Sequence, residues 1–283
     1  MVEAEFSIHN ASYADRSRLA ALIHFGSYVQ QHLDWKSPLD WIGGQPYLLL
    51  EKNEGLLATL ACPPDLPEIA WVRLFAVSSN IKPDYAWRLL WEATLDEISH
   101  NGIMQVAALS MQSWFTDILL ASKFEQTDNV NILICENKFA IHDPNMAFVI
   151  IRPMMHEDLP FIVDIDNSAF NREWRNSFEA LELAFQQSSY TTVAEIGDEI
   201  IGYQYSTSNG LGGHLARLAV KEAMQRKGIG FLLVQDLLKH FRQNGILHIT
   251  VNTQQSNIAS LALYAKAGFK TTGEQYRVYK YIL

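Results

Sequence analysis

Residues 218–230 read Leu-Ala-Val-Lys-Glu-Ala-Met-Gln-Arg-Lys-Gly-Ile-Gly, and this stretch decides how the chain folds. The pattern predicts a short apolar strand, a basic loop with two glycines, and the start of a helix. The first amides of a helix lack internal partners, and the helix dipole favours an anion beside them. Gly228 and Gly230 leave room for an anion against the backbone, and Arg226 and Lys227 add positive charge. The stretch therefore predicts a phosphate-binding loop.

The spacing Gln225-x-x-Gly228-x-Gly230 differs from the dinucleotide-binding and P-loop patterns. It resembles the pyrophosphate-binding motif of the GNAT superfamily of N-acetyltransferases, which bind acetyl-coenzyme A. Glycine turns before helices also occur where nothing binds, so the downstream sequence matters. Residues 246–251 predict a strand, and residues 252–269 carry an asparagine, a short helix with Leu-Tyr, and a closing Gly-Phe. This segment resembles a second GNAT motif, and the likeness covers residues 148–283.

The resemblance implies roles for individual residues. Asn257 would contact the pantetheine arm of the coenzyme, and Tyr264 would stand near its sulfur. The strand at residues 214–220 would polarise the thioester carbonyl through a backbone amide, that of Leu218 or Val220. The residues expected at the coenzyme are Leu218, Ala219, Val220, Gln225, Arg226, Lys227, Gly228, Ile229, Gly230, Asn252, Asn257, Ser260 and Tyr264.

Acetyl transfer also needs a base for the amine and an acid for the leaving thiolate. Tyr264 is the expected acid, because the reference pKa of a phenol, about 10, is close to that of a thiol; the alternative is a packed aromatic. His214 occupies the place where many family members carry a glutamate base, and histidine titrates near neutral pH; the alternative is an ordinary surface histidine. Ribosomal-protein N-terminal acetyltransferases are similar to this half, but they carry a glutamate where this chain has Asn252. Asn252 cannot accept a proton, although it can orient a water or the amine.

The rest of the C-terminal half fits a mixed α/β fold, in which a mostly antiparallel sheet is flanked by helices. The pattern predicts a flexible loop at residues 208–213 and a final hairpin that carries Tyr276, Arg277, Tyr279 and Tyr281. Arg277 and Tyr279 could clamp a carboxyl-bearing acceptor, or they could be ordinary sheet surface. The expected elements are strands at 148–152, 190–196, 200–206, 214–220 and 246–251, and helices from 157, at 178–187 and at 231–241.

The N-terminal half repeats this plan in a weaker form. Residues 75–77 align with residues 218–220 at an offset of 143, and residues 113–124 align with 258–269 at an offset of 145. We therefore expect two tandem GNAT-like domains, 1–140 and 147–283, with a linker at Asn137–Met146.

This N-terminal copy lacks the chemistry of the other. Without a gap, Tyr85 and Trp87 correspond to Gly228 and Gly230, and such side chains would fill the space of a pyrophosphate. Asp84 would repel the anion, and Leu119 stands where the other half has Tyr264. We therefore expect the copy to bind no coenzyme. Its tryptophans are expected in the core: Trp35, Trp41, Trp71, Trp87, Trp91 and Trp114.

Composition restricts the function further. The net charge of −9 disfavours a nucleic-acid partner and suits a cationic amine. The sequence shows neither a membrane-spanning run nor a secretory segment, so we expect a cytoplasmic protein with Cys62 and Cys135 reduced. No metal-ligand pattern appears in the sequence.

The favoured function is that of an acetyl-CoA-dependent N-acetyltransferase with a catalytic C-terminal domain. The acceptor would be a small-molecule amine or a peptide N-terminus, and the tandem layout resembles that of the mycothiol synthases, which favours a small molecule. Three alternatives stay open: a protein N-terminal acetyltransferase, a non-catalytic acyl-CoA-binding sensor, and a structural partner protein. The intact loop at residues 225–230 argues against the last, because only anion binding is expected to require both Gly228 and Gly230.

Overall fold

The computed structural model describes residues 6–136 and 148–283, and it divides into two compact units. Unit 1 consists of Met1–Thr127 together with Tyr276–Leu283, and unit 2 consists of Asp128–Gln275. The expected linker, Asn137–Met146, lies outside the described residues.

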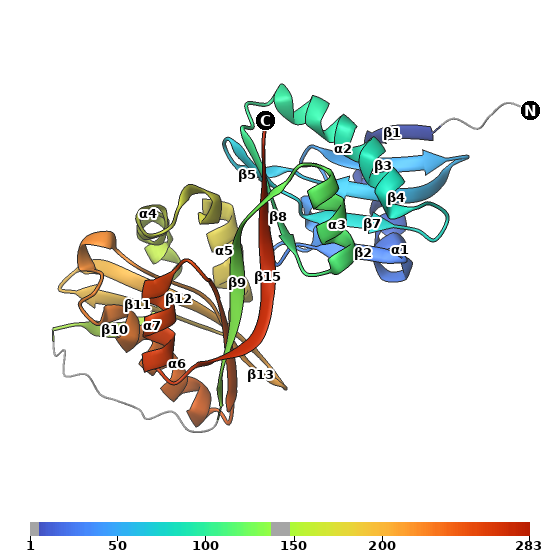
Figure 1. Cartoon of the computed structure of the whole chain (residues 1–283). Coiled ribbons are helices and arrows are strands. Elements are labelled where there is room, and N and C mark those ends of the chain that lie inside the picture. Colours follow the sequence, from blue (N-terminus) through green and yellow to red (C-terminus); the bar gives the residue numbers. More distant parts are fainter. Residues whose placement is uncertain (1–5, 137–147) are drawn as a thin grey trace, which may run out of the picture. The chain divides into compact units, whose positions relative to one another are not determined.

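Unit 1 contains two groups of strands with helices packed on them (Figure 1). The first group is a five-stranded sheet ordered β1 (Phe6–Asn10), β3 (Tyr47–Lys52), β4 (Gly55–Ala61), β7 (Leu74–Val77) and β2 (Tyr28–Gln31). The second group contains β8 (Gln105–Ser110), β6 (Ile69–Trp71) and β5 (Pro64–Leu66), and β6 pairs in parallel with β8. The helices are α1 (Arg16–Phe25), α2 (Pro83–Ser99) and α3 (Ser113–Ala121), with short turns η1 (Tyr13–Asp15) and η2 (Pro38–Trp41).

Aromatic residues fill the core of unit 1. Trp87 stacks on Trp91 with 5.3 Å between ring centroids, and Phe75 packs edge-on against Trp87. The indole N–H of Trp87 donates to Oγ of Ser122 at 2.8 Å, so this buried donor has a hydrogen-bond partner. Four of the tryptophans expected in the core are buried, namely Trp41, Trp71, Trp87 and Trp91, and the other two are half-buried.

Unit 2 is one sheet with helices on both faces (Figure 1). Its strands follow the order β10 (Ile150–Pro153), β11 (Tyr190–Ile196), β12 (Glu199–Asn209), β13 (Gly212–Val220), β14 (His248–Gln254), β9 (Glu125–Glu136) and β15 (Lys270–Ile282). The helices are α4 (Leu159–Ala169), α5 (Phe178–Gln187), α6 (Ile229–Gln243) and α7 (Ile258–Lys266), with short turns η3 (His156–Asp158), η4 (Arg172–Trp174) and η5 (Glu222–Met224).

Helices α4 and α6 cover opposite faces of this sheet, and neighbouring residues of β12 show it. The hydroxyl of Tyr203 donates to Asp166 of α4, whereas a Cβ at Gly202 would meet Leu233 of α6 at 3.3 Å. Adjacent strand residues point to opposite faces, so the two helices enclose the sheet. The predicted mixed α/β fold with flanking helices is confirmed.

The last strands differ from expectation. Residues 270–282 form one strand, β15, where a hairpin was expected, and residues 277–282 pair with β8 of unit 1. Residues 130–136 of β9 pair with β14 of unit 2. Each unit therefore includes a strand from the other half of the sequence. Tyr279 is only 1% exposed, within the core of unit 1, so the predicted carboxylate clamp is wrong.

The flexible loop predicted at residues 208–213 is a tight turn. Oδ1 of Asn209 accepts from the amides of Leu211 and Gly212 at 2.8 and 3.1 Å, so β12 and β13 extend almost to the tip. A Cβ at Gly212 would lie 2.7 Å from the carbonyl oxygen of His248, so only glycine fits this close approach.

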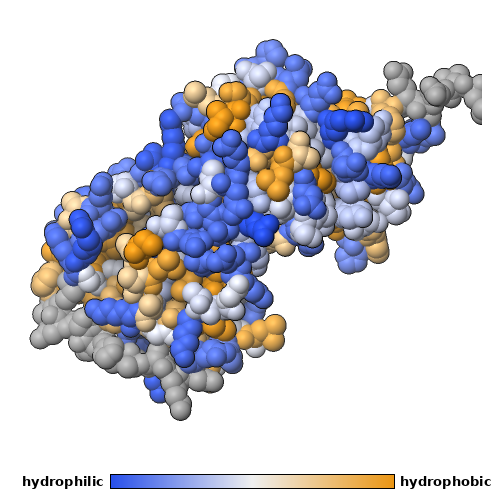
Figure 2. All heavy atoms as spheres, in the orientation of Figure 1, coloured by the Kyte–Doolittle hydropathy of each residue, from blue (hydrophilic) through white to orange (hydrophobic). Residues whose placement is uncertain are grey.

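On the face drawn in Figure 2 the surface is mainly hydrophilic, and hydrophobic residues form separate small groups. The most exposed large apolar side chains are those of Leu211 and Phe25. Over residues 6–136 and 148–283, every helix is too short or too polar to cross a lipid bilayer.

Candidate active site

Strands β13 and β14 are parallel, but they pair over three residues only. Residues 213–215 face residues 249–251. Strand β13 then continues to Val220 and β14 to Gln254 without further pairing between them. The two strands therefore separate beyond Leu215 and leave an opening in the sheet of unit 2.

The edge of β13 that borders this opening carries free backbone groups. The amide of Lys221 donates to the carbonyl of Ile201 at 2.8 Å, and amides along an antiparallel strand alternate between its two edges. By that alternation the amides of Leu218 and Val220 point into the opening. Within the described part of the chain, no strand pairs with this edge at residues 217–220. Both amides are therefore available to an extended ligand.

The loop after β13 enters α6 through two left-handed residues. Arg226 has a φ of +60°, and Gly228, which precedes the helix, has a φ of +88° that glycine adopts without strain. Nε2 of Gln225 donates to the carbonyl of Val220 at 3.0 Å and ties the loop to the strand. Arg226 and Lys227 are exposed beside the helix N-terminus, which no side chain of the described residues caps.

Gly230 lies in the first turn of α6, close to neighbouring side chains. A Cβ there would lie 3.2 Å from Cδ2 of Leu263 and 3.7 Å from the side chains of Leu218 and Val220. Packing therefore restricts Gly230, and backbone conformation restricts Gly228. The argument that only anion binding requires both glycines is wrong, because each has a structural reason; the phosphate role of the loop stays a prediction.

The side chain of Asn257 caps α7. Its Oδ1 accepts from the amide of Ser260 at 3.0 Å, the usual role of asparagine at this position. Its NH₂ group donates to no described residue, so it is the part of Asn257 that a ligand could use.

Tyr264 lies in the middle of α7 with its ring in the core of unit 2. The ring is 5.7 Å from that of Phe269, and the residue is 5% exposed. Burial raises the pKa of the phenol above its usual value, so the hydroxyl stays protonated at any physiological pH. No described residue hydrogen-bonds to this hydroxyl, which leaves it available to donate a proton.

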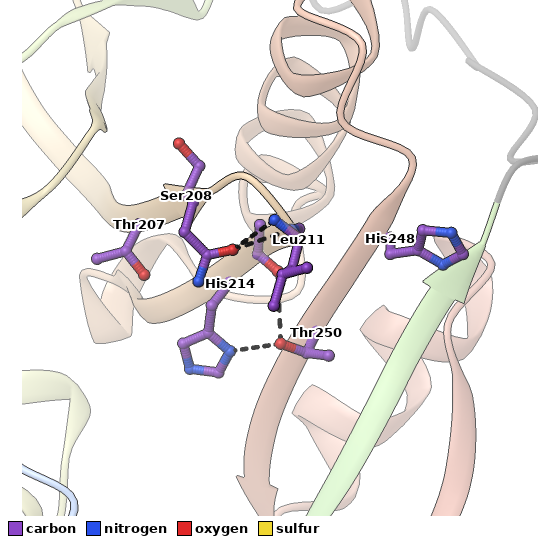
Figure 3. Close-up of a pocket in the computed structure, with 9 residues that line it drawn as sticks. Thr207, Ser208, Leu211, His214, His248 and Thr250 are labelled. Carbon is purple, nitrogen blue, oxygen red and sulfur yellow. Dashed lines mark hydrogen bonds between the residues drawn. The ribbon is translucent and has the colours of Figure 1, made fainter.

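His214 lines a pocket of about 290 Å³ at the other end of β13, formed by residues 207–209, 211–214, 248 and 250. Its Nδ1 lies 2.8 Å from Oγ1 of Thr250, and Figure 3 shows the ring turned toward Thr250 while His248 points away. Burial lowers the pKa of His214, and a hydrogen bond with the backbone of Thr250 opposes this only in part. The imidazole is therefore neutral at pH 7, as a base must be.

The structure does not bring His214 and Tyr264 together on one face. Ile249 and Val251 point into the core under α6 and α7, together with Tyr264, so Thr250 between them points to the other face with His214. The opening between β13 and β14 connects the two faces of the sheet.

Distance along the strand separates the candidate base from the candidate carbonyl donor. His214 lies four residues before Leu218, which in extended backbone is about 13 Å. Proton transfer to His214 therefore requires intervening water. Asn252, two residues after Thr250 and half-buried, lies on the same face and could hold such a water.

Sequence reasoning missed Arg217, a half-buried cation on β13 next to Leu218. Its Nε and Nη2 donate to the two oxygens of Asp166 at 2.5 and 2.9 Å, and Asp166 is fully buried. Nη2 also donates to the carbonyl of Trp174 at 2.7 Å, and the ring of Phe170 lies 3.9 Å from Cζ. A charged residue within the apolar run Ala216-Arg217-Leu218-Ala219-Val220 was the available signal.

The sequence of this region matches a known family. Residues 159–269 match the model of the Acetyltransferase (GNAT) family, and they include the opening, the loop and α7. Residues 159–269 are thus similar to a GNAT acetyltransferase domain.

Two curated relatives are similar to this chain in sequence, and a solved structure is similar to it in fold. The uncharacterized N-acetyltransferase YvbK of Bacillus subtilis is 36% identical over 75 residues, which are 26% of this chain and 48% of that protein. The alignment thus spans about half the length of that relative. The uncharacterized N-acetyltransferase MJ1530 of Methanocaldococcus jannaschii is 29% identical over 126 residues, 43% of this chain and 78% of that protein. A tandem GNAT protein from the clavulanic acid biosynthesis pathway has the same fold, with a TM-score of 0.69 at 13% identity over 99% of this chain and 98% of that one.

The N-terminal copy differs from the GNAT domain in a way that corrects the ungapped alignment. Five residues, 78–82, separate β7 from α2, whereas eight, 221–228, separate β13 from α6. When the starts of α2 and α6 are aligned, Lys82 corresponds to Gly228 and Asp84 corresponds to Gly230. Trp87 packs in the core of unit 1 and does not obstruct a phosphate site. The loop of the copy is shorter, and α2 begins with Pro83, which has no N–H to offer an anion.

Residues 6–136 and 148–283 contain no cluster of three or more histidine, cysteine or acidic side chains that could hold a metal ion. Cys62 and Cys135 are both buried and unpaired.

Proposed function

We propose that the chain is an acetyl-CoA-dependent N-acetyltransferase and that unit 2 performs the reaction. The observation that carries this proposal is the open edge of β13, where the amides of Leu218 and Val220 lie beside the N-terminus of α6. An extended ligand with amide groups can pair with a free strand edge. A phosphate group can bind the first amides of the helix.

The residues around the opening fit acetyl-CoA. Arg226 and Lys227 would neutralise the phosphates at the start of α6, where Gly228 lets the backbone approach. The NH₂ group of Asn257 would donate to the pantetheine arm. The hydroxyl of Tyr264 would meet the sulfur on the α6 side of the sheet, and the pocket beside His214 would admit an amine from the other side.

In the proposed mechanism the amide of Leu218 stabilises the negative charge that develops on the thioester oxygen. Loss of one such donor typically costs a factor of about 10² to 10³ in rate. His214 accepts a proton from the substrate ammonium through water, and its low pKa keeps it neutral for that role. The amine nitrogen then bonds to the carbonyl carbon as the carbon–sulfur bond breaks, and Tyr264 donates its proton to the departing sulfur. The nitrogen loses its remaining extra proton to water, and the phenolate of Tyr264 takes a proton back from water, so that the products are the amide and the free thiol.

The experiment that tests this function combines binding with turnover. Acetyl-CoA is titrated into the full chain by calorimetry, and a panel of small amines and peptides is then screened for release of free thiol. We expect micromolar binding and turnover with at least one amine. Binding without turnover on any acceptor would favour a non-catalytic acyl-CoA sensor, and absence of binding would refute the proposal.

Charge at the loop is tested with a matched pair of variants. R226N/K227Q removes both cations at the start of α6, and asparagine tolerates the left-handed conformation at 226. The control K239Q/R242Q removes two exposed cations from the far end of the same helix. We expect the KM for acetyl-CoA to rise about tenfold or more in the first variant only, because charged hydrogen bonds to phosphate are lost. Equal changes in both would contradict a specific phosphate site.

A further inference from the structure

The two units follow the same plan closely enough to compare residue by residue. Turn η1 of unit 1 and turn η3 of unit 2 both precede the first helix and differ by 143 in number. The parallel ladders agree as well, since Ala70 faces Val106 in unit 1 and Gly213 faces Ile249 in unit 2, again at an offset of 143. By this offset Ile23 and Leu74 of unit 1 occupy the positions of Asp166 and Arg217.

In unit 1 the strand edge that corresponds to the open edge of β13 is paired. Strand β2 runs antiparallel along β7, with Tyr28 facing Val77 and Gln31 facing Leu74. The amide of Ser27 donates to the carbonyl of Val77 at 2.9 Å. The backbone groups of Leu218 and Val220 are free in unit 2. The corresponding backbone groups of unit 1 therefore already have hydrogen-bond partners in β2.

The side chain of Gln30 completes this closure. It is 2% exposed, and its Nε2 donates to the carbonyl of Leu109 in β8 at 3.1 Å. Its Oε1 accepts from the amide of Met111 at 3.4 Å. Gln30 thus spans the space between β7 and β8, which corresponds to the opening between β13 and β14 in unit 2. We call this space the slot of each unit. The slot of unit 1 is filled by the protein's own chain.

The equivalent segment of unit 2 follows a different path. Like β2 after α1, turn η4 begins three residues after its helix, α4, ends. It does not pair with β13. Arg217 holds it instead, because Nη2 binds the carbonyl of Trp174 and Phe170 lies against the guanidinium.

Asp166 anchors the same segment from the helix side. Its Oδ1 accepts from the amide of Asn176 at 3.1 Å as well as from Arg217, and its Oδ2 accepts from Tyr203. The pair thus fixes residues 170–176 at both ends. Ile23 and Leu74 of unit 1 offer no charge for such contacts, and there the segment lies in the slot.

We infer that Arg217 and Asp166 are positioning residues that hold residues 170–176 away from the free edge of β13 and so keep the slot of unit 2 open. The inference rests on the proposed function only in taking this slot as the coenzyme site. In unit 1, where apolar residues replace the pair, the segment becomes β2 and closes the slot.

The test copies the residues of unit 1 into unit 2. The variant D166I/R217L removes both charges together, because removal of one would leave a buried unpaired charge and could unfold the domain. Hydrogen exchange of residues 217–220 is measured without ligand, and binding of coenzyme A is measured by calorimetry. We expect these amides to exchange more slowly than in the wild type, because the released segment pairs with them, and affinity for coenzyme A to fall at least tenfold.

The control R152L/D158N breaks another bidentate Arg–Asp pair of unit 2, at the end of β10, far along the sheet order from β14. We expect it to lower the Tm while affinity for coenzyme A stays within twofold. Faster exchange at 217–220 in D166I/R217L, or unchanged affinity, would overturn the inference, since a merely structural pair would loosen the strand.

A second measurement needs no variant. In the ligand-free wild type, the amides of Phe75 and Val77 should be protected while those of Leu218 and Val220 exchange rapidly. Equal protection of the two sets would also overturn the inference. If the wild type binds no coenzyme A, the proposed function fails, but both exchange experiments still decide whether the pair keeps the slot open.

Discussion

Nδ1 of His214 lies 2.8 Å from Oγ1 of Thr250, at the middle of the three-residue ladder that joins β13 to β14. The hydroxyl of Thr250 also donates to the carbonyl of Gly213 at 3.4 Å. It therefore accepts from Nδ1–H, which leaves the lone pair of His214 on Nε2. The contact thus selects the tautomer that a base requires.

The first prediction concerns pH. The folded-state pKa of His214 lies below the ordinary value of 6.5, so the neutral form predominates above that pH and is lost as pH falls through the lowered pKa. We expect kcat/KM to rise with pH, with the midpoint of the rise below pH 6.5. His214→Asn should lower kcat about 10²-fold and abolish the fall of kcat/KM at low pH, which we call the acid limb.

Thr250→Val serves as the companion variant. The contact that raises the pKa of His214 is with the backbone of Thr250, which this variant keeps, so the pH dependence should stay in place. Loss of the hydroxyl that selects the tautomer should instead lower kcat. An acid limb that persists unchanged in His214→Asn would show that another group is the base.

The second prediction concerns Tyr264. Tyr264→Phe removes a hydroxyl without protein partners and keeps the ring packed on Phe269, so the Tm should change by only a few degrees. Loss of a general acid should lower kcat about 10²-fold or more, and less with an acetyl thioester of a more acidic thiol. The control is Tyr190→Phe, which removes a hydroxyl bound to Asp236 on the outer part of α6. If both variants keep full kcat, Tyr264 is only a packing residue.

The third prediction separates backbone strain from ligand contact at the loop. Gly228 and Gly245 flank α6 and both have left-handed φ, +88° and +75°. Alanine at either position should destabilise the fold by about 1–2 kcal/mol, measured by urea unfolding. Only Gly228→Ala should also raise the KM for acetyl-CoA, because only that end of the helix faces phosphate in the proposed complex. An unchanged KM would remove the loop from the binding site.

Local pattern was enough to predict much of unit 2. The limits of α5 and β11 agree with prediction, because Ser177 caps the helix and because apolar residues recur with the right period. The positions of Tyr264 on α7 and of His214 on β13 also follow from local sequence. Their roles and the coenzyme contacts stay predictions.

Other features depend on partners distant in sequence. Nothing local indicates that β15 pairs with β8, or that Arg217 binds Asp166 51 residues away. The three-residue difference between the loops before α2 and α6 escapes an ungapped comparison, because the strands before them align without a gap. Pairing across a sheet carries no signature in the period of a single strand.

The fourth prediction is that one molecule of acetyl-CoA binds per chain. In unit 1, β2 pairs with β7, Gln30 spans the slot, and α2 starts with Pro83 and the carboxylate of Asp84, which repels phosphate. Calorimetric titration of the full chain should therefore give a stoichiometry near one.

Gln30→Ala tests whether strand β2 or the side chain of Gln30 excludes the coenzyme from unit 1. The amides of Ser27 and His32 donate to Val77 and Arg73 without this side chain, so the variant should still bind a single coenzyme. A second site in the wild type would contradict the closed-slot account outright. A second site that appears only in Gln30→Ala would show that the side chain, and not strand β2, excludes the ligand.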